Sequence, residues 1–459
     1  MKKTFILYAS LLFSLIIGSF YSCELEEPNE VDEPNETEVL NEDTPPTTSI
    51  IDWQKVLGGS NTDDPAIIKP TTDGGYIIAG STYSYNGDIM SNHGKWDCWI
   101  VKLNNSGNIQ WQKTLGGTQD DGANSISPTT DGGYIVAGYT LSNDGDIIGH
   151  HGSRDFWVVK LDNNGNIQWQ KALGGSSTDI AYSVSPTADG GYIVAGETWS
   201  NNGDVTDKHG NGDCWVVKLD NSGNIQWQKA MGGGNNEVVR SVSSTDDGGY
   251  IVAGQTGSNN GDVMGNNGGG DYWIVKLDND GNIQWQKTLG GSGNDIAYSL
   301  ILTTEGGYIV AGETRSNNGD VVGNSNYLGQ GDYWIVKLDN NGNIQWQKAF
   351  GGSSRDIATN ISSTSDGGYI VAGHTSSKNG DVIAGNHGGY DYWIIKLDNN
   401  GNIKSATYPL GGSNTDEVRS MVATANGGCV IAGYTKSNNG DVEEALANGD
   451  FWILKLTGF

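Results

Sequence analysis

Residues 156–171 read Phe-Trp-Val-Val-Lys-Leu-Asp-Asn-Asn-Gly-Asn-Ile-Gln-Trp-Gln-Lys, and the chain repeats this stretch almost unchanged along its length. The first tryptophan recurs at Trp99, Trp157, Trp215, Trp273, Trp334, Trp393 and Trp452. The second recurs at Trp53, Trp111, Trp169, Trp227, Trp285 and Trp346, at intervals of 58 residues and once 61. A fixed period of this length, rich in β-branched and aromatic residues, indicates a repeat architecture built from strands.

Each repeat contains four strand signals separated by turn residues. In the unit 121–175 we expect strands at 124–129, 134–139, 156–161 and 166–171, with Asp-Gly-Gly and Asp-Asn-Asn-Gly turns between the first and last pairs. The second and third strands are continuously apolar, which indicates burial on both faces. Four strands per unit, covered by neighbouring units, predict an all-β propeller with seven four-stranded blades.

The two ends of the repeat region predict how the ring closes. The region begins with a lone fourth strand at 51–57 and finishes with a lone third strand at 451–456. The N-terminal strand can therefore complete the last blade, which closes the ring by strand pairing and leaves no open edge.

These repeats resemble those of secreted bacterial seven-bladed propellers, whose units are about 60 residues long. The Leu-Asp-Asn-Asn-Gly-Asn-Ile-Gln-Trp stretch is also similar to the tryptophan-docking motif of quinoprotein-like propellers. That resemblance implies that the tryptophan packs between blades and that Asp and Gly form the turn before it. It specifies the fold far more strongly than the function.

The N-terminal region predicts export and lipid attachment. Residues 1–22 have two lysines, an apolar run and small residues before Cys23, which is typical of a signal peptide. A cysteine in this place resembles a bacterial lipoprotein processing site, with lipidation on Cys23. The acidic segment 23–49 resembles the tether of surface lipoproteins of the Bacteroidota, and its composition predicts disorder. We therefore expect an outer-membrane lipoprotein exposed at the cell surface, with the propeller at 50–459.

Composition narrows the classes of partner. The formal net charge is −28 and the pI is about 4.3, so the basic footprint of a nucleic-acid-binding protein is missing. Cys98, Cys214 and Cys429 replace aromatic residues of the repeat, which indicates small apolar fillers and no disulfide framework. We expect a monomer.

Three acidic positions recur in every blade. The first lies at the entry to the innermost strand and is expected to circle the mouth of the channel: Asp63, Asp121, Asp179, Glu237, Asp295, Asp356 and Asp416. Two others bracket the long loop, and their oxygens on a glycine-flexible loop are candidate Ca²⁺ ligands. The candidates are Asp146, Asp155, Asp204, Asp213, Asp262 and Asp271. The alternative is that all these acids accept backbone N–H bonds and hold the loops in shape.

The positions where the blades differ are candidates for ligand binding. Around the end of the second strand and in the long loop, residue type varies in size and charge while the framework stays constant. The candidates are Tyr83, Tyr85, Trp96, Tyr139, Trp199, Arg315 and His374. Exposed aromatic side chains of this kind stack on sugar rings or anchor a protein partner.

The sequence favours a non-catalytic binding or scaffold protein that recognises a protein or glycan through the long-loop face. No nucleophile–base pair or phosphate-binding glycine loop stands out. A glycoside-processing enzyme is the alternative, and it requires two carboxylates present in only one or two blades. A Ca²⁺-stabilised structural spacer is the second alternative. No other cofactor is expected.

Overall fold

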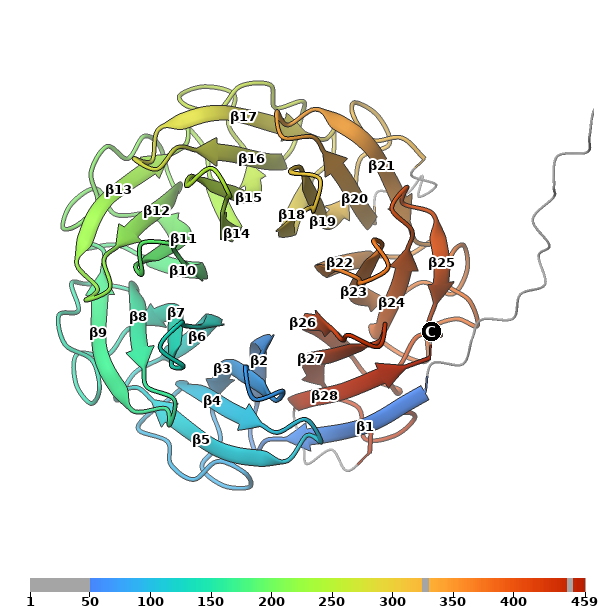
Figure 1. Ribbon diagram of the computed structural model, residues 1–459, viewed down its shortest axis with the longest axis horizontal. Coiled ribbons are helices and arrows are strands. Elements are labelled where there is room, and N and C mark those ends of the chain that lie inside the picture. The colour runs from blue at the N-terminus through green and yellow to red at the C-terminus, as the bar shows by residue number, and fades with distance from the viewer. Residues whose placement is uncertain (1–49, 324–329, 444–448, 459) are drawn as a thin grey trace, which may run out of the picture. The chain divides into compact units, whose positions relative to one another are not determined.

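The computed structural model describes residues 50–323, 330–443 and 449–458, and these form a seven-bladed β-propeller (Figure 1). The predicted fold is therefore confirmed. Each blade is a four-stranded antiparallel sheet, and the blades surround a central axis in chain order. No helix among the described residues is long and apolar enough to cross a bilayer. The predicted signal peptide, Cys23 and the acidic segment lie outside the described residues.

The strands fall into four classes by their distance from the axis. The innermost strands are β2 (Asp63–Pro70), β6 (Asp121–Pro128), β10 (Asp179–Pro186), β14 (Glu237–Ser244), β18 (Asp295–Leu302), β22 (Asp356–Ser363) and β26 (Asp416–Ala423). The second strands are β3 (Tyr76–Thr82), β7 (Tyr134–Thr140), β11 (Tyr192–Thr198), β15 (Tyr250–Thr256), β19 (Tyr308–Thr314), β23 (Tyr369–Thr375) and β27 (Cys429–Thr435).

The third and outermost strands complete the blades. The third strands are β4 (Asp97–Leu103), β8 (Asp155–Leu161), β12 (Asp213–Leu219), β16 (Asp271–Leu277), β20 (Asp332–Leu338), β24 (Asp391–Leu397) and β28 (Asp450–Thr457). The outermost strands are β1 (Ile50–Leu57), β5 (Ile109–Leu115), β9 (Ile167–Leu173), β13 (Ile225–Met231), β17 (Ile283–Leu289), β21 (Ile344–Phe350) and β25 (Ile403–Ala406).

The innermost strands begin three residues earlier than the apolar pattern predicts, because the recurrent acid at their start already pairs with the second strand. Asp179, for example, is paired with Thr198. The last blade contains β1 at its outer edge, next to β28, with Ile50 opposite Thr457 and Leu57 opposite Phe451. The ring thus closes as predicted.

The core lies between the blades. Every residue of β8, β12, β16 and β20 is buried, and the fully buried first tryptophan of each repeat packs against the preceding blade. The aromatic residue before that tryptophan contacts the next blade; Phe156 lies 4.5 Å from Trp215 between ring centroids. Cys98 and Cys214 occupy the same place and are buried free thiols. Trp157 and Trp273 of the next blades lie in the same buried clusters as these thiols.

The second tryptophan joins adjacent blades in the way that the docking resemblance implies. A Cβ on Gly281, whose φ is +80°, would lie 2.8 Å from the ring of Trp227 in the preceding blade. Trp227 also donates its Nε1–H to the carbonyl oxygen of Asn279 in the same turn, at 3.0 Å. Only glycine combines this left-handed conformation with such close approach of the ring.

One blade junction lacks this contact, and the sequence marks it. Ser405 stands where the sixth blade would carry its tryptophan. The seventh blade has no turn between its third and fourth strands, because those strands are the two ends of the propeller chain. The tryptophan is therefore missing at the junction where its partner turn does not exist.

Candidate functional site

The acids at the start of the innermost strands are fully buried inside the blades. In Asp179, Oδ2 accepts hydrogen bonds from Ser200 Oγ at 2.8 Å and from the backbone N–H of Gly175 at 2.9 Å, and Oδ1 accepts one from Thr198. Burial raises the pKa of the equivalent Asp356 to about 6. We expected these acids around the channel mouth. They point into the blades instead, because the last Thr of the second strand and the Ser two residues after it donate hydrogen bonds to them.

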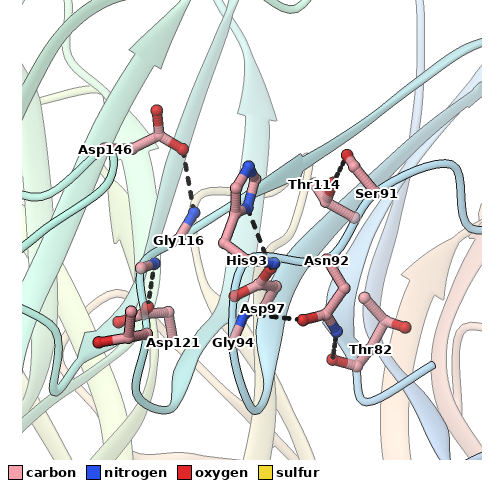
Figure 2. A network of polar contacts seen from close by, with 12 residues as sticks. Thr82, Ser91, Asn92, His93, Gly94, Asp97, Thr114, Gly116, Asp121 and Asp146 are labelled. Carbon is pink, nitrogen blue, oxygen red and sulfur yellow. Dashed lines mark hydrogen bonds and ion pairs between the residues drawn. The ribbon is translucent and has the colours of Figure 1, made fainter. Parts of the chain in front are cut away.

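The two acids that bracket one long loop lie at different blade junctions. Asp146 Oδ2 accepts a hydrogen bond from the N–H of Gly116 at 3.1 Å, whereas Asp155 Oδ2 accepts one from the N–H of His151. Asp146 instead comes near Asp97 and Asp121 at the junction of the first and second blades (Figure 2). The six Ca²⁺ candidates therefore do not form the three same-loop pairs that the sequence suggests.

Each junction instead brings two buried carboxylates close to one glycine. Asp271 Oδ1 and Asp295 Oδ2 each lie 2.5 Å from the position that a Cβ on Gly290 would take. Asp271 Oδ1 has no hydrogen-bond partner among the described residues. Burial raises the pKa of Asp271 to about 6. The backbone hydrogen bond from Asn267 acts against this increase, and the negative charge of Asp295 adds to it. The acids repel one another across a site that only glycine fits.

Metal-ligating side chains do not converge in the described ranges. No group of three or more His, Cys, Asp or Glu residues there has the arrangement of a metal site. The histidines of the long loops pair with the carboxylate of their own blade, as His93 Nδ1 does with Asp97 Oδ2 at 3.1 Å (Figure 2). His209 also approaches Asp262 of the next blade, at 3.7 Å. Calcium binding remains a prediction that chelation can test.

Two cavities follow the central axis and meet at a ring of seven residues. The cavity towards the long loops has a volume of about 440 Å³, and we call it the upper chamber. The cavity towards the Asp-Gly-Gly turns has a volume of about 520 Å³ and is the lower chamber. Seven residues line both chambers: Ala66, Asn124, Tyr182, Arg240, Tyr298, Thr359 and Arg419.

A β-bulge in every innermost strand turns these seven residues towards the axis. In β10 the pairing with β11 shifts between Ala181 and Ser183, so Tyr182 is the inserted residue. The same shift occurs at the equivalent residue of the other six blades. Bulges of this kind re-aim a side chain and locally break the strict alternation of faces.

The regular alternation of strand residues does not predict this ring. Ala181 and Val184 both lie in a buried cluster although they are three residues apart, which regular alternation forbids. The signal that could have found it is the variation between blades: the residue before the recurrent serine or its equivalent is Ala, Asn, Tyr, Arg, Tyr, Thr or Arg.

Two of the seven predicted ligand residues line the upper chamber. These are Trp96 and Tyr139, and Tyr83 packs on Trp96 with ring centroids 5.6 Å apart. Tyr85 and Trp199 lie on the long-loop face with 59% and 41% of their surface exposed. Tyr85 donates its hydroxyl to the carbonyl oxygen of Gly94.

The side chains of the two remaining candidates, Arg315 and His374, interact with other residues of the protein. Arg315 forms an ion pair with the buried Glu313 at 2.8 Å, and Arg355 binds the same carboxylate at 2.7 Å. His374 is only 4% exposed and packs edge-on against Tyr390. Burial, together with the nearby Arg419 and Arg355, lowers the pKa of His374 to about 3. His374 is therefore neutral and contributes shape rather than charge.

All five arginines of this acidic chain gather around the channel. Arg240 and Arg419 line both chambers. Arg154 lies over the ring of Tyr139, with its guanidinium carbon 5.0 Å from the centroid. Arg315 and Arg355 share Glu313, which occupies on β19 the place of Tyr139 on β7. The channel is thus the cationic part of a protein whose net charge is −28.

Comparisons with known proteins support the fold alone. No protein-family model matches the chain. The regulatory protein FlaEY of Caulobacter vibrioides is 27% identical over 222 residues, which is 45% of this chain and 23% of that protein. The chain thus spans about a quarter of that relative's length.

One solved propeller has a similar fold and a distant sequence. The WD40 β-propeller domain of Doa1 superposes with a TM-score of 0.50 at 13% identity, covering 89% of this chain and 97% of that one. A protein of unknown function from Bacteroides caccae gives a TM-score of 0.39 at 12% identity, covering 69% and 91%.

Proposed function

We propose that this protein is a non-catalytic binding module that recognises a protein or glycan through its long-loop face, centred on the upper chamber. The observation that carries this proposal is the convergence of different side chains from separate blades on one cavity. Trp96, Tyr139, Tyr182 and Tyr298 supply aromatic surface, and Arg240 and Arg419 supply charge. A cavity of about 440 Å³ with apolar walls and a few polar groups is typical of a ligand site.

The asymmetry of this cavity supports recognition instead of a purely structural role. Blade stacking requires the same residues in all seven blades, and the buried tryptophans and glycines meet that requirement. The chamber residues differ from blade to blade, although some also join neighbouring blades, as Arg419 does with Asp64. Aromatic rings beside arginines are the side chains that most often dominate binding energy at interfaces.

The enzyme alternative receives less support from the same cavity. Glycoside hydrolysis by the usual mechanism needs two carboxylates on either side of the scissile bond. Asp64 is the sole acidic residue among the described residues that line the upper chamber. Its carboxylate is bound by Arg419, with Nε 3.0 Å from Oδ1. The lining therefore supplies neither a free carboxylate nor a pair.

Binding to glycan arrays and to cell-envelope extracts tests the proposal. We expect Trp96→Ala and Tyr83→Ala to weaken binding about tenfold or more, because each removes an aromatic surface at the chamber mouth. Ile283→Ala is the matched control: its side chain is 37% exposed, close to the 39% of Tyr83, but lies beside a turn at the other end of the propeller. The proposal would be refuted if Tyr83→Ala and the control lost the same amount of binding affinity. It would also be refuted if no glycan or envelope component bound the wild type more tightly than Trp96→Ala.

We further propose that a lipid on Cys23 holds the propeller at the outer surface of the cell. The support is the apolar segment before Cys23 and the acidic stretch after it. Metabolic labelling with a fatty-acid analogue should mark the wild type and leave Cys23→Ser unlabelled. Protease added to intact cells should then degrade the propeller of the wild type. A labelled Cys23→Ser variant would disprove lipidation at this residue, and full protection of the wild type would disprove surface exposure.

A further inference from the structure

The lower chamber is lined by cations and hydroxyl groups. Its cationic residues are Lys69 on β2, Arg240 on β14 and Arg419 on β26. No aspartate or glutamate occurs among the described residues that line it. Serines from six innermost strands and Thr359 contribute hydroxyl groups, and Asn360 contributes an amide. The charge of this lining is positive, whereas the net charge of the protein is −28.

Two of the three cations have no anionic partner. Arg419 is paired with Asp64 and with Glu417, whose Oε2 lies 2.8 Å from Nη1. No carboxylate of the described ranges lies within ion-pair distance of Lys69 or Arg240. The guanidinium of Arg240 lies 4.3 Å from the ring centroid of Tyr182, and its Nε is buried without a hydrogen-bond partner. A desolvated cation whose N–H groups lack acceptors destabilises a protein unless an anion supplies the opposite charge and the missing acceptors.

The nearby acids do not compensate these cations. The turns at this end carry acids in six of the seven blades, with two in the fourth blade, and the seventh blade has Asn426 instead. In each of those six blades one acid is bound to a lysine of the same blade. Lys102 Nζ lies 2.8 Å from Asp73 Oδ2, and Lys160 and Lys218 make the same contact with Asp131 and Asp189. Burial lowers the pKa of Lys69, which is the direction expected of an ammonium group without a counter-ion.

Three serine hydroxyls of the lower chamber accept a backbone hydrogen bond, whereas Ser127 and Ser241 donate to carbonyl oxygens of the next blade. Ser183 Oγ accepts a hydrogen bond from the N–H of Val242 in the next blade at 3.1 Å, and Ser125 Oγ accepts one from Val184 at 3.2 Å. Ser299 Oγ accepts one from Ile361 at 3.4 Å. None of these three hydroxyls donates to an acceptor among the described residues. A hydroxyl whose oxygen is already an acceptor keeps its proton for another partner.

We propose that the lower chamber binds a small oxyanion, held by Arg240 and Lys69 and by the serine hydroxyls of the innermost strands. The guanidinium fork suits two oxygens of a phosphate, sulfate or carboxylate group, and the ammonium group acts as a point charge. A chamber of about 520 Å³ accommodates such a group, either free or as part of a small organic acid. This site shares Arg240 with the upper chamber, whereas Lys69 and the serines of the innermost strands line the lower chamber alone.

Titration calorimetry of the full chain with sodium phosphate tests the site. We expect the wild type to bind, Arg240→Gln and Lys69→Met to bind about tenfold more weakly, and the double variant to show no measurable binding. Lys378→Met is the control, because it removes an exposed lysine on a long loop, and it should bind as the wild type does. No heat of phosphate binding in the wild type, or unchanged affinity in the double variant, would overturn the proposal.

Two further measurements separate a direct role from an effect on folding. Without anion, Lys69→Met should melt at the same temperature as the wild type or higher, because it removes a half-buried charge that has no ion-pair partner. Added phosphate should raise the melting temperature of the wild type and of Arg240→Lys, and not that of the double variant. A rise in the double variant equal to that of the wild type would contradict the proposal.

The same titrations identify the source of the anion. Inorganic sulfate and galacturonate are used beside phosphate. Binding of sulfate and phosphate alone supports a free inorganic ion, whereas binding of galacturonate as well supports the acid group of a small organic ligand. Lys69→Met should retain the ligand of the long-loop face, so loss of anion binding and loss of that ligand are distinguishable results.

Discussion

Asp271 shows how a single carboxylate can report on the state of a blade junction. Its Oδ1 is buried without a hydrogen-bond partner among the described residues, and it faces the carboxylate of Asp295. The folded protein therefore favours the protonated form, with a pKa of about 6 against an ordinary value of 3.8. The resulting stabilisation is fully present below about pH 4 and is lost as the pH rises through about 6.

The variant Asp271→Asn cannot ionise, and its amide can donate to Asp295. We therefore expect a higher melting temperature than the wild type at about pH 8 and a much smaller difference at about pH 4. Thermal unfolding at the two pH values measures this change. Asp280→Asn, which alters an exposed acid of the turn at the other end of β16, serves as the control. A gain of the same size at both pH values would show that the charge of Asp271 is not the cause.

At the scale of the element, two glycines of one blade distinguish the effect of the tryptophan contact from the effect of a left-handed backbone conformation. Gly281 and Gly248 lie in the two turns of the fourth blade with φ of +80° and +82°. A Cβ on Gly281 would meet the ring of Trp227, whereas nothing lies within 4 Å of a Cβ on Gly248. Both alanine variants pay the cost of a left-handed residue, about 1–2 kcal/mol, and only Gly281→Ala also displaces the tryptophan.

We therefore expect Gly281→Ala to lower the free energy of unfolding by more than Gly248→Ala does. Urea denaturation of the two variants gives the comparison, and their difference isolates the contact between blades. Equal losses would mean that the tryptophan moves aside without cost.

The sequence predicted the elements and their order because each strand carries its own pattern of apolar and turn residues. It did not predict where side chains point at the start and in the middle of the innermost strand. The direction of Asp179 depends on Ser200, which is 21 residues away, and that of Tyr182 depends on a bulge. The alternation of strand residues predicts neither the distant hydrogen bond nor the bulge. The recurrent acids were therefore expected at the channel, and the residues at the bulges, which line it, were not predicted.

At the scale of the whole molecule, stability depends on the strand that closes the ring. β1 pairs along β28 from Ile50 to Leu57, and Trp53 docks on Gly107 of the first blade. Deleting residues 50–57 would expose the edge of β28 and remove that docking contact. We expect a lower melting temperature and self-association through the free edge. Light scattering coupled to size exclusion measures the association, with Trp53→Ala as the control that keeps the strand. A monomeric deletion variant with unchanged melting would contradict this expectation.

The distribution of charge also belongs to this scale. Most of the acids hold turns and junctions or lie on the surface, while the arginines surround the axis. A soluble anion meets a repulsive surface before it reaches an attractive channel, so its approach should become faster as salt screens the surface.

The pairing of Ile50 with Thr457 has a mechanical consequence. Both ends of the propeller chain leave the ring at the same end of one antiparallel strand pair. Pulling these ends apart strains the residue pairs between β1 and β28 one after another, starting at Ile50 and Thr457. The seven residue pairs do not carry the force together. The ring should therefore open at low force at this single seam, while a pull applied across two blades must break whole sheets apart.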